Sequence, residues 1–84
     1  MKYMIFKKYT MPESQHGYCE RIRVVILNSG RIEVLYSHCG NGNGCFWTDP
    51  EDITSYREFY GKGINEVVTN LVKWGFTFVQ ERKC

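Results

Sequence analysis

The chain has 84 residues, of which 43% are hydrophobic, 15% aromatic and 24% charged, and its formal net charge at pH 7 is +2. This length allows one small domain, residues 1–84, and excludes a fold such as the TIM barrel, which needs about 250 residues. The composition indicates a globular chain, since disordered chains contain fewer aromatic and apolar residues. A net charge of +2 is too small to indicate a polyanionic partner by itself.

No segment has the length of a membrane span, because the longest purely apolar run covers only residues 24–27. The apolar patch at residues 3–6 is too short for the core of a signal peptide. We therefore expect a cytoplasmic protein. In that reducing setting the four cysteines are expected to carry thiols; they are Cys19, Cys39, Cys45 and Cys84.

Three strands are predicted in the first half of the chain, over residues 2–9, 19–27 and 31–38. The turn Asn28-Ser29-Gly30 joins the second strand to the third. A three-residue loop with Gly30 in the left-handed conformation places six large apolar or aromatic residues on one face, whereas a two-residue loop mixes apolar and charged partners. The six residues are Ile22, Val24, Ile26, Ile32, Val34 and Tyr36.

A short fourth strand is predicted over residues 45–47, and a helix is predicted to begin at Thr48 or Asp49, because Pro50 suits the first helical position. This helix is expected to end near Gly61. A second helix is predicted from Ile64, with apolar residues at helical spacing, and Gly75 is placed to end it. Residues 76–82 alternate in the manner of a last strand.

The predicted fold class is therefore α+β, with a mostly antiparallel sheet of four to five strands and two helices packed on one face. The predicted order along the chain is β-β-β-(β)-α-α-β. Strands and helices are segregated in this order, which distinguishes it from alternating β-α units.

One group of side chains has the donors that zinc prefers, three thiols and one imidazole. Its members are His16, Cys19, Cys39 and Cys45. The three-residue turn places Cys19 opposite Cys39, but no pair has the usual zinc-knuckle spacing and His38 points to the other face of the sheet. We expect no metal and no cofactor, with a Cys19–Cys39 disulfide as the alternative in an oxidising compartment.

We also expect no enzymatic activity. No nucleophile is fixed beside a base by the sequence pattern, and the acidic residues at 49–52 are explained by a helix start. The glycine-rich segments 40–44 and 61–63 lack the Gly-Lys-Ser/Thr that follows a phosphate-binding loop, so they are interpreted as connections.

A protein-binding surface is the main functional prediction. Several apolar and aromatic residues have no assignable partner in the predicted core, and arginine, tryptophan and tyrosine are the residue types that dominate protein interfaces. The predicted surface consists of Arg21, Arg23, Val25, Leu35, Phe46 and Trp47.

The alternative is a nucleic-acid-binding module that uses an Arg-rich sheet face. Its candidate residues are Arg21, Arg23, Arg31, Lys7 and Lys8, with Tyr3 or Tyr9 as stacking partners for bases. Three acidic residues, Glu20, Glu33 and Glu81, are expected among these cations, so the sequence favours a solvated face of mixed charge.

The sequence thus predicts a small non-catalytic binding protein of the accessory, regulatory or inhibitor kind, such as phages and mobile elements carry. Its expected partner is another protein, with a homodimer as a further alternative and no membrane association. A nucleic-acid module and a zinc-stabilised domain are the competing hypotheses.

Overall fold

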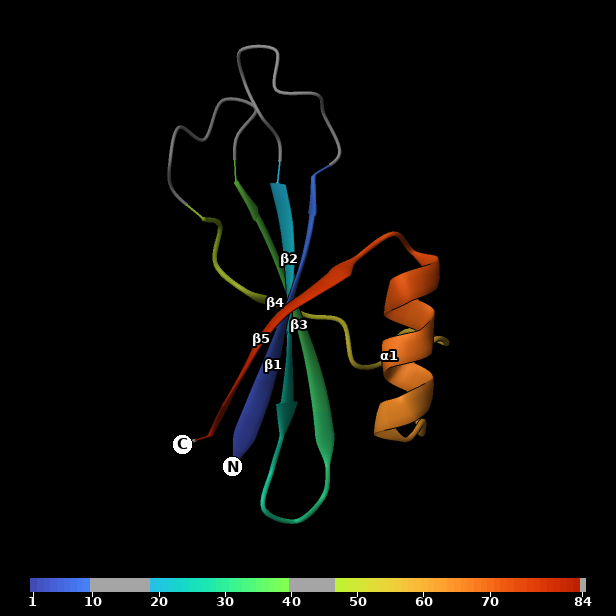
Figure 1. Cartoon of the computed structure of the whole chain (residues 1–84). Helices are drawn as coiled ribbons and strands as arrows, with labels where there is room; N and C mark the ends of the chain where they lie inside the picture. Colours follow the sequence, from blue (N-terminus) through green and yellow to red (C-terminus); the bar gives the residue numbers. More distant parts are fainter. Residues whose placement is uncertain (10–18, 40–46, 84) are drawn as a thin grey trace.

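The computed structural model describes residues 1–9, 19–39 and 47–83, and within these ranges it contains one five-stranded sheet and one helix (Figure 1). The side chains of Tyr9 and Lys83 lie outside this description. The elements in chain order are β1 (Lys2–Tyr9), β2 (Cys19–Ile26), β3 (Ile32–Cys39), β4 (Glu51–Asp52), α1 (Ile64–Lys73) and β5 (Thr77–Lys83).

All strand pairings in the sheet are antiparallel, in the order β4-β3-β2-β1-β5. The last strand therefore returns to pair with the first, and Lys2 lies opposite Lys83. The α+β class and the antiparallel sheet are confirmed. None of the described helices has the length and apolar character that crossing a membrane requires.

The hairpin between β2 and β3 has the predicted three-residue loop. Ile26 lies opposite Ile32, Val24 opposite Val34, and Gly30 has a φ of 90°. The N–H of Gly30 donates to the carbonyl of Leu27 at 2.8 Å, which closes the turn. This register matters because a slip of one residue would turn every buried side chain of the hairpin to the opposite face.

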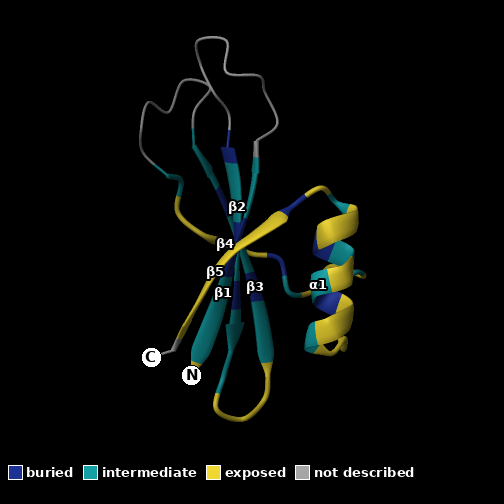
Figure 2. Cartoon of the chain, in the orientation of Figure 1, coloured by how far each residue is buried: buried dark blue, intermediate teal, exposed yellow. Residues whose placement is uncertain are grey.

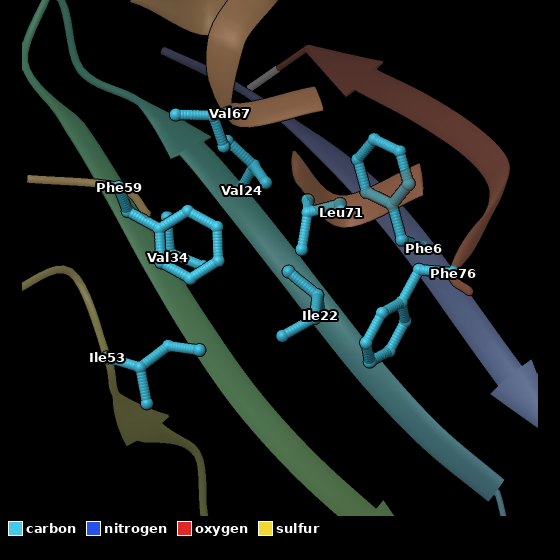
Figure 3. Close-up of a cluster of buried hydrophobic side chains, with 9 residues drawn as sticks. All are labelled: Phe6, Ile22, Val24, Val34, Ile53, Phe59, Val67, Leu71 and Phe76. Carbon is cyan, nitrogen blue, oxygen red and sulfur yellow. The ribbon is translucent and has the colours of Figure 1, made fainter. Parts of the chain in front are cut away.

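The hydrophobic core lies between the sheet and α1 (Figures 2 and 3). Strands β1, β2 and β3 contribute side chains from one face, and α1 contributes Val67 and Leu71, which are fully buried. The core residues are Phe6, Ile22, Val24, Val34, Ile53, Phe59, Val67, Leu71 and Phe76. Burial of this apolar area is the main stabilising contribution to the fold.

The predicted first helix, from residues 48–49 to Gly61, is wrong. The chain instead runs beside β3, where the N–H of Thr48 donates to the His38 carbonyl at 2.9 Å and that of Ile53 to the Val34 carbonyl at 2.9 Å. β4 and a series of turns replace the helix, and the buried side chains of Ile53 and Phe59 anchor the segment. Backbone pairing with the edge of the sheet outweighed the favourable helix-start residues.

The position of the fourth strand also differs from the prediction. β4 comprises Glu51 and Asp52, and Trp47 is not part of a strand, whereas residues 45 and 46 lie outside the described part of the chain. The N–H groups of Val34 and His38 donate to the hydroxyls of Thr54 and Thr48, and the His38 carbonyl accepts from the Thr48 N–H, so irregular chain with two threonine hydroxyls completes this edge.

The predicted helix beginning at Ile64 is confirmed as α1, and Gly75 follows it with a φ of 95°. Val72 lies at helical spacing from Ile64, eight residues along the predicted apolar stripe, but is 58% exposed. The helix contacts the core through a narrower stripe that includes Val67 and Leu71. Lys8 of β1 secures its end, because the Nζ atom donates to the Trp74 carbonyl at 2.7 Å.

β5 does not follow the simple alternation predicted for residues 76–82. A β-bulge shifts its register against β1 between Ile5 and Phe6, so Phe78 lies opposite Phe6 while Gln80 lies opposite Ile5. The extra residue reverses the alternation along the strand. Glu81 therefore lies opposite Met4, on the side of the sheet that carries α1, and pairs with Lys2 at 3.4 Å.

Candidate binding face

The face of the sheet that points away from α1, here called the helix-free face, carries the predicted surface residues. Strand alternation places Arg21, Arg23 and Val25 of β2 on this face, and Leu35 of β3 lies opposite Arg23. All four side chains are half-buried. The register of the hairpin thus brings four of the six predicted residues together.

Trp47 joins this set from outside the strands. Its ring lies under the guanidinium of Arg21, with 4.2 Å between the guanidinium carbon and the ring centroid, and the Nζ atom of Lys7 is 5.8 Å from the same centroid. A cation over the indole face is an attractive arrangement. The sixth predicted residue, Phe46, lies outside the described part of the chain.

Arg21 and Arg23 lie two residues apart on β2, and each side chain has its own contacts. The Nε atom of Arg21 donates to the hydroxyl of Ser37 at 3.3 Å, and the guanidinium of Arg23 lies 5.6 Å from the ring centroid of Tyr3. The Nε atom of Arg23 is buried and has no hydrogen-bond partner among residues 1–9, 19–39 and 47–83. Burial lowers the pKa of Arg21 from its ordinary value, and the like charge of Arg23 lowers it further, against the opposing effect of Cys39 and Cys19.

These two arginines have no ion pair with a described carboxylate. The ion pairs formed between described residues are Lys2–Glu81 and Lys62–Glu66, neither of which lies on the helix-free face. Two neighbouring guanidinium groups repel each other, and each half-buried charge has lost part of its hydration. An anionic group bound beside these arginines would relieve both costs.

The charge on this face differs from the sequence prediction. Glu20 lies on the α1 side and accepts a hydrogen bond from the Tyr36 hydroxyl at 2.8 Å, and the bulge in β5 places Glu81 on the same side. Of the three acids expected among the cations, Glu33 remains, opposite Val25. Arg82 adds a fourth cation on the helix-free face, opposite Tyr3. The centre of the face is therefore cationic.

Two of the basic residues in the nucleic-acid hypothesis lie elsewhere. Lys8 is on the α1 side, where its Nζ atom also lies 5.6 Å from the ring centroid of Phe76. Arg31 precedes β3, is exposed, and its positive charge acts on Asp52 at the sheet edge. Lys7 and Tyr3 do lie with the central arginines, whereas the side chain of Tyr9 is outside the description.

The predicted metal ligands are only partly placed. Cys19 and Cys39 are directly opposite each other in β2 and β3, as predicted, whereas His16 and Cys45 lie outside the described part. His38 lies on the other face, where its ring is 6.0 Å from that of Tyr36. Within the described ranges no three His, Cys, Asp or Glu side chains are grouped so that they would hold a metal ion.

Two residues outside the predicted binding surface shape this face. Ser37 is buried and holds the Arg21 guanidinium, and Ile5 is buried between its neighbours Arg23 and Gln80 on adjacent strands. The parity of the β2–β3 register identifies Ser37, which lies opposite Arg21. The pairing of β1 with β2 and β5, on which the position of Ile5 depends, has no such short-range signal.

Comparisons of this chain with protein-family models, with curated proteins and with solved structures find no match.

Proposed function

We propose that this chain is a non-catalytic binding protein that docks an acidic segment of another protein on its helix-free face. The observation that carries the proposal is the pair Arg21 and Arg23, two half-buried arginines on the same face of β2 without a described carboxylate partner. Charge-assisted, bidentate bonds from arginine to a carboxylate are among the strongest polar contacts at interfaces.

The surroundings of the two arginines favour a protein over a nucleic acid. Val25 and Leu35 place half-buried apolar side chains beside the cations, as in an interface with an apolar centre and charged neighbours. The rings of Trp47 and Tyr3 already have guanidinium groups over them, which competes with base stacking. Tryptophan, tyrosine and arginine are also the residue types on which protein binding energy concentrates.

A single-stranded nucleic acid is the second candidate partner. It is favoured by the position of Glu20 and Glu81 on the α1 side, which leaves the helix-free face more basic than the sequence indicated. Phosphates would be bound by the same two arginines, Arg21 and Arg23, to which we assign carboxylates.

The test compares proteins retained from a cell lysate by the unmodified chain and by two double variants of equal charge. Arg21→Gln with Arg23→Gln removes the central cations, whereas Arg57→Gln with Lys73→Gln removes two exposed cations outside the helix-free face. We expect specific retention of a protein that survives nuclease treatment, is lost with the first variant and persists with the second. Circular dichroism of each variant establishes that it is folded.

Two results would contradict the proposal. Equal retention by both double variants would mean that the helix-free face does not bind the partner. Retention that nuclease abolishes, together with micromolar binding of a single-stranded oligonucleotide that weakens steeply as salt rises, would establish the nucleic-acid function instead.

A further inference from the structure

The thiols of Cys19 and Cys39 form a directly opposed pair at the end of the β2–β3 ladder. The two residues are Cα partners in the antiparallel register, so their side chains project from the same face of the sheet. Both residues carry thiols in this structure. They belong to the helix-free face, two residues along each strand from Arg21 and Ser37.

The hydrogen bonds of β3 show whether Cys19 and Cys39 form a hydrogen-bonded or a non-hydrogen-bonded pair of the ladder. The backbone groups of Val34 and His38 point away from β2, since they bond to Thr48, Ile53 and Thr54. The intervening odd-numbered residues therefore bond toward β2, and Cys39 with Cys19 occupies a hydrogen-bonded pair. At such a pair the Cα atoms are about 5.5 Å apart, which lies within the range that a disulfide spans.

A disulfide at this site is within reach of the two cysteines but would be strained. Opposed Cβ atoms in a ladder are about 4.5–5.5 Å apart and are widest at hydrogen-bonded pairs, whereas a disulfide holds them about 3.5–4.5 Å apart. The bond thus requires a small local displacement of the two strands. Strained disulfides are more readily reduced than relaxed ones, which suits a bond that forms and breaks reversibly.

The two thiols differ in access. Cys19 is 7% exposed and its Sγ atom contacts the Glu20 carbonyl at 3.8 Å, whereas Cys39 is half-buried. A dissolved reagent therefore reaches Cys39 first, and Cys19 is placed to react with whatever forms on Cys39. A more accessible thiol beside a buried partner is the arrangement that thiol–disulfide exchange requires.

We propose that Cys19 and Cys39 are a redox-active dithiol that exchanges reversibly with small-molecule disulfides. The Cys39 thiolate, having lost its proton to solvent, attacks one sulfur of the small disulfide, whose S–S bond breaks and releases one thiolate. The Cys19 thiolate then attacks the Cys39 sulfur and releases the second. Two protein thiols are oxidised to one disulfide, and the small disulfide is reduced to two thiols that take up the two protons.

This inference does not depend on the proposed partner, because it rests only on the register and the exposure of two cysteines. The disulfide would nevertheless act on the helix-free face, since Arg21 and Ser37 are the next pair of these strands on that face and are joined by a hydrogen bond. Oxidation is therefore also expected to shift the position of Arg21.

The test uses a background with Cys45→Ser and Cys84→Ser, which leaves only Cys19 and Cys39. This protein is incubated in mixtures of oxidised and reduced glutathione. The exchange is quenched by alkylation, and the mass of the intact protein is measured by mass spectrometry. We expect a product lighter by two hydrogen atoms that resists alkylation and returns to the dithiol when reduced glutathione is in excess. In the same background Cys19→Ser should accumulate a mixed disulfide on Cys39, and Cys39→Ser should react more slowly.

The equilibrium between the dithiol and the internal disulfide is also measured in urea, where the protein is unfolded. This comparison does not depend on the behaviour of any single cysteine variant. If the register brings the thiols together, the folded protein should favour the internal disulfide over the unfolded one by at least about tenfold at equal glutathione. Equal ratios in the folded and unfolded protein would overturn the proposal. So would a mixed disulfide that persists on Cys39 while Cys19 is present.

Discussion

The guanidinium of Arg21 lies over the ring of Trp47, 4.2 Å from its centroid, and so connects β2 to the segment that precedes β4. The same arginine donates to the Ser37 hydroxyl of the neighbouring strand. Its side chain is thereby held by two contacts on the helix-free face. Such a side chain loses less conformational entropy when a partner binds.

The contact between Arg21 and Trp47 should contribute to stability in a way that single variants cannot isolate. We expect a double-mutant cycle of Arg21→Ala and Trp47→Ala to give a favourable coupling of about 0.5–2 kcal/mol. Urea unfolding followed by circular dichroism measures it without relying on tryptophan fluorescence. A parallel cycle of Arg21→Ala with Tyr60→Ala should be additive, because Tyr60 is 72% exposed. Additivity in both cycles would contradict the coupling.

Thr54 should be important for the edge of the sheet. Its Oγ1 atom accepts from the N–H of buried Val34 at 2.9 Å and donates to Asp52 Oδ1 at 2.5 Å. Thr54→Val leaves the Val34 N–H without this partner, so we expect a loss of about 1–3 kcal/mol in the free energy of unfolding. Thr54→Ser retains the hydroxyl and should lose much less. Equal losses for both variants would mean that the methyl group, not the hydrogen bond, is responsible.

Asp52 should make stability depend on pH in the acidic range. Hydrogen bonds from the hydroxyl and then the N–H of Thr54 lower the pKa of Asp52 below its ordinary value of 3.8. The unfolded chain therefore binds this proton more readily, and the stabilisation is complete above pH 3.8 and decreases as the pH falls through the lower folded value.

The matched variant for this pH dependence is Asp52→Asn, which does not titrate. The difference in unfolding free energy between the unmodified chain and this variant should be constant near neutral pH and should shrink as the pH falls below about 4. Urea unfolding at a series of pH values measures this difference. A difference that stays constant down to pH 2 would show that Asp52 has the same pKa in both states.

Gly30 should be the residue on which the β2–β3 turn depends. Its φ of 90° is strained for a residue with a Cβ atom, although nothing lies within 4 Å of the position that a Cβ would occupy. We expect Gly30→Ala to destabilise the chain by about 1–2 kcal/mol through backbone strain alone. Gly30→Asn should cost clearly less, since asparagine tolerates the left-handed region. Thermal unfolding of both variants makes the comparison, and equal costs would refute the argument.

The sequence alone determined those parts of the fold whose signals are local. The β2–β3 register follows from six apolar side chains and one glycine, and from it follow the pairing of Cys19 with Cys39 and the shared face of Arg21, Arg23, Val25 and Leu35. The helix α1 follows from its apolar periodicity and from Gly75. In each case neighbouring residues specify the geometry, because side-chain alternation and helical spacing are short-range properties.

Tertiary structure alone decided the features that depend on distant partners. Residues 51–52 pair with β3 although their local sequence favours a helix. The backbone N–H and carbonyl groups at the outer edge of β3 require hydrogen-bond partners, and this segment provides them. The bulge in β5 moved Glu81 to the α1 side, and the Trp47 ring lies against the guanidinium of Arg21, which is 26 residues away in the sequence. The cationic centre of the helix-free face thus arises from contacts between segments far apart in the chain, which neither periodicity nor composition encodes.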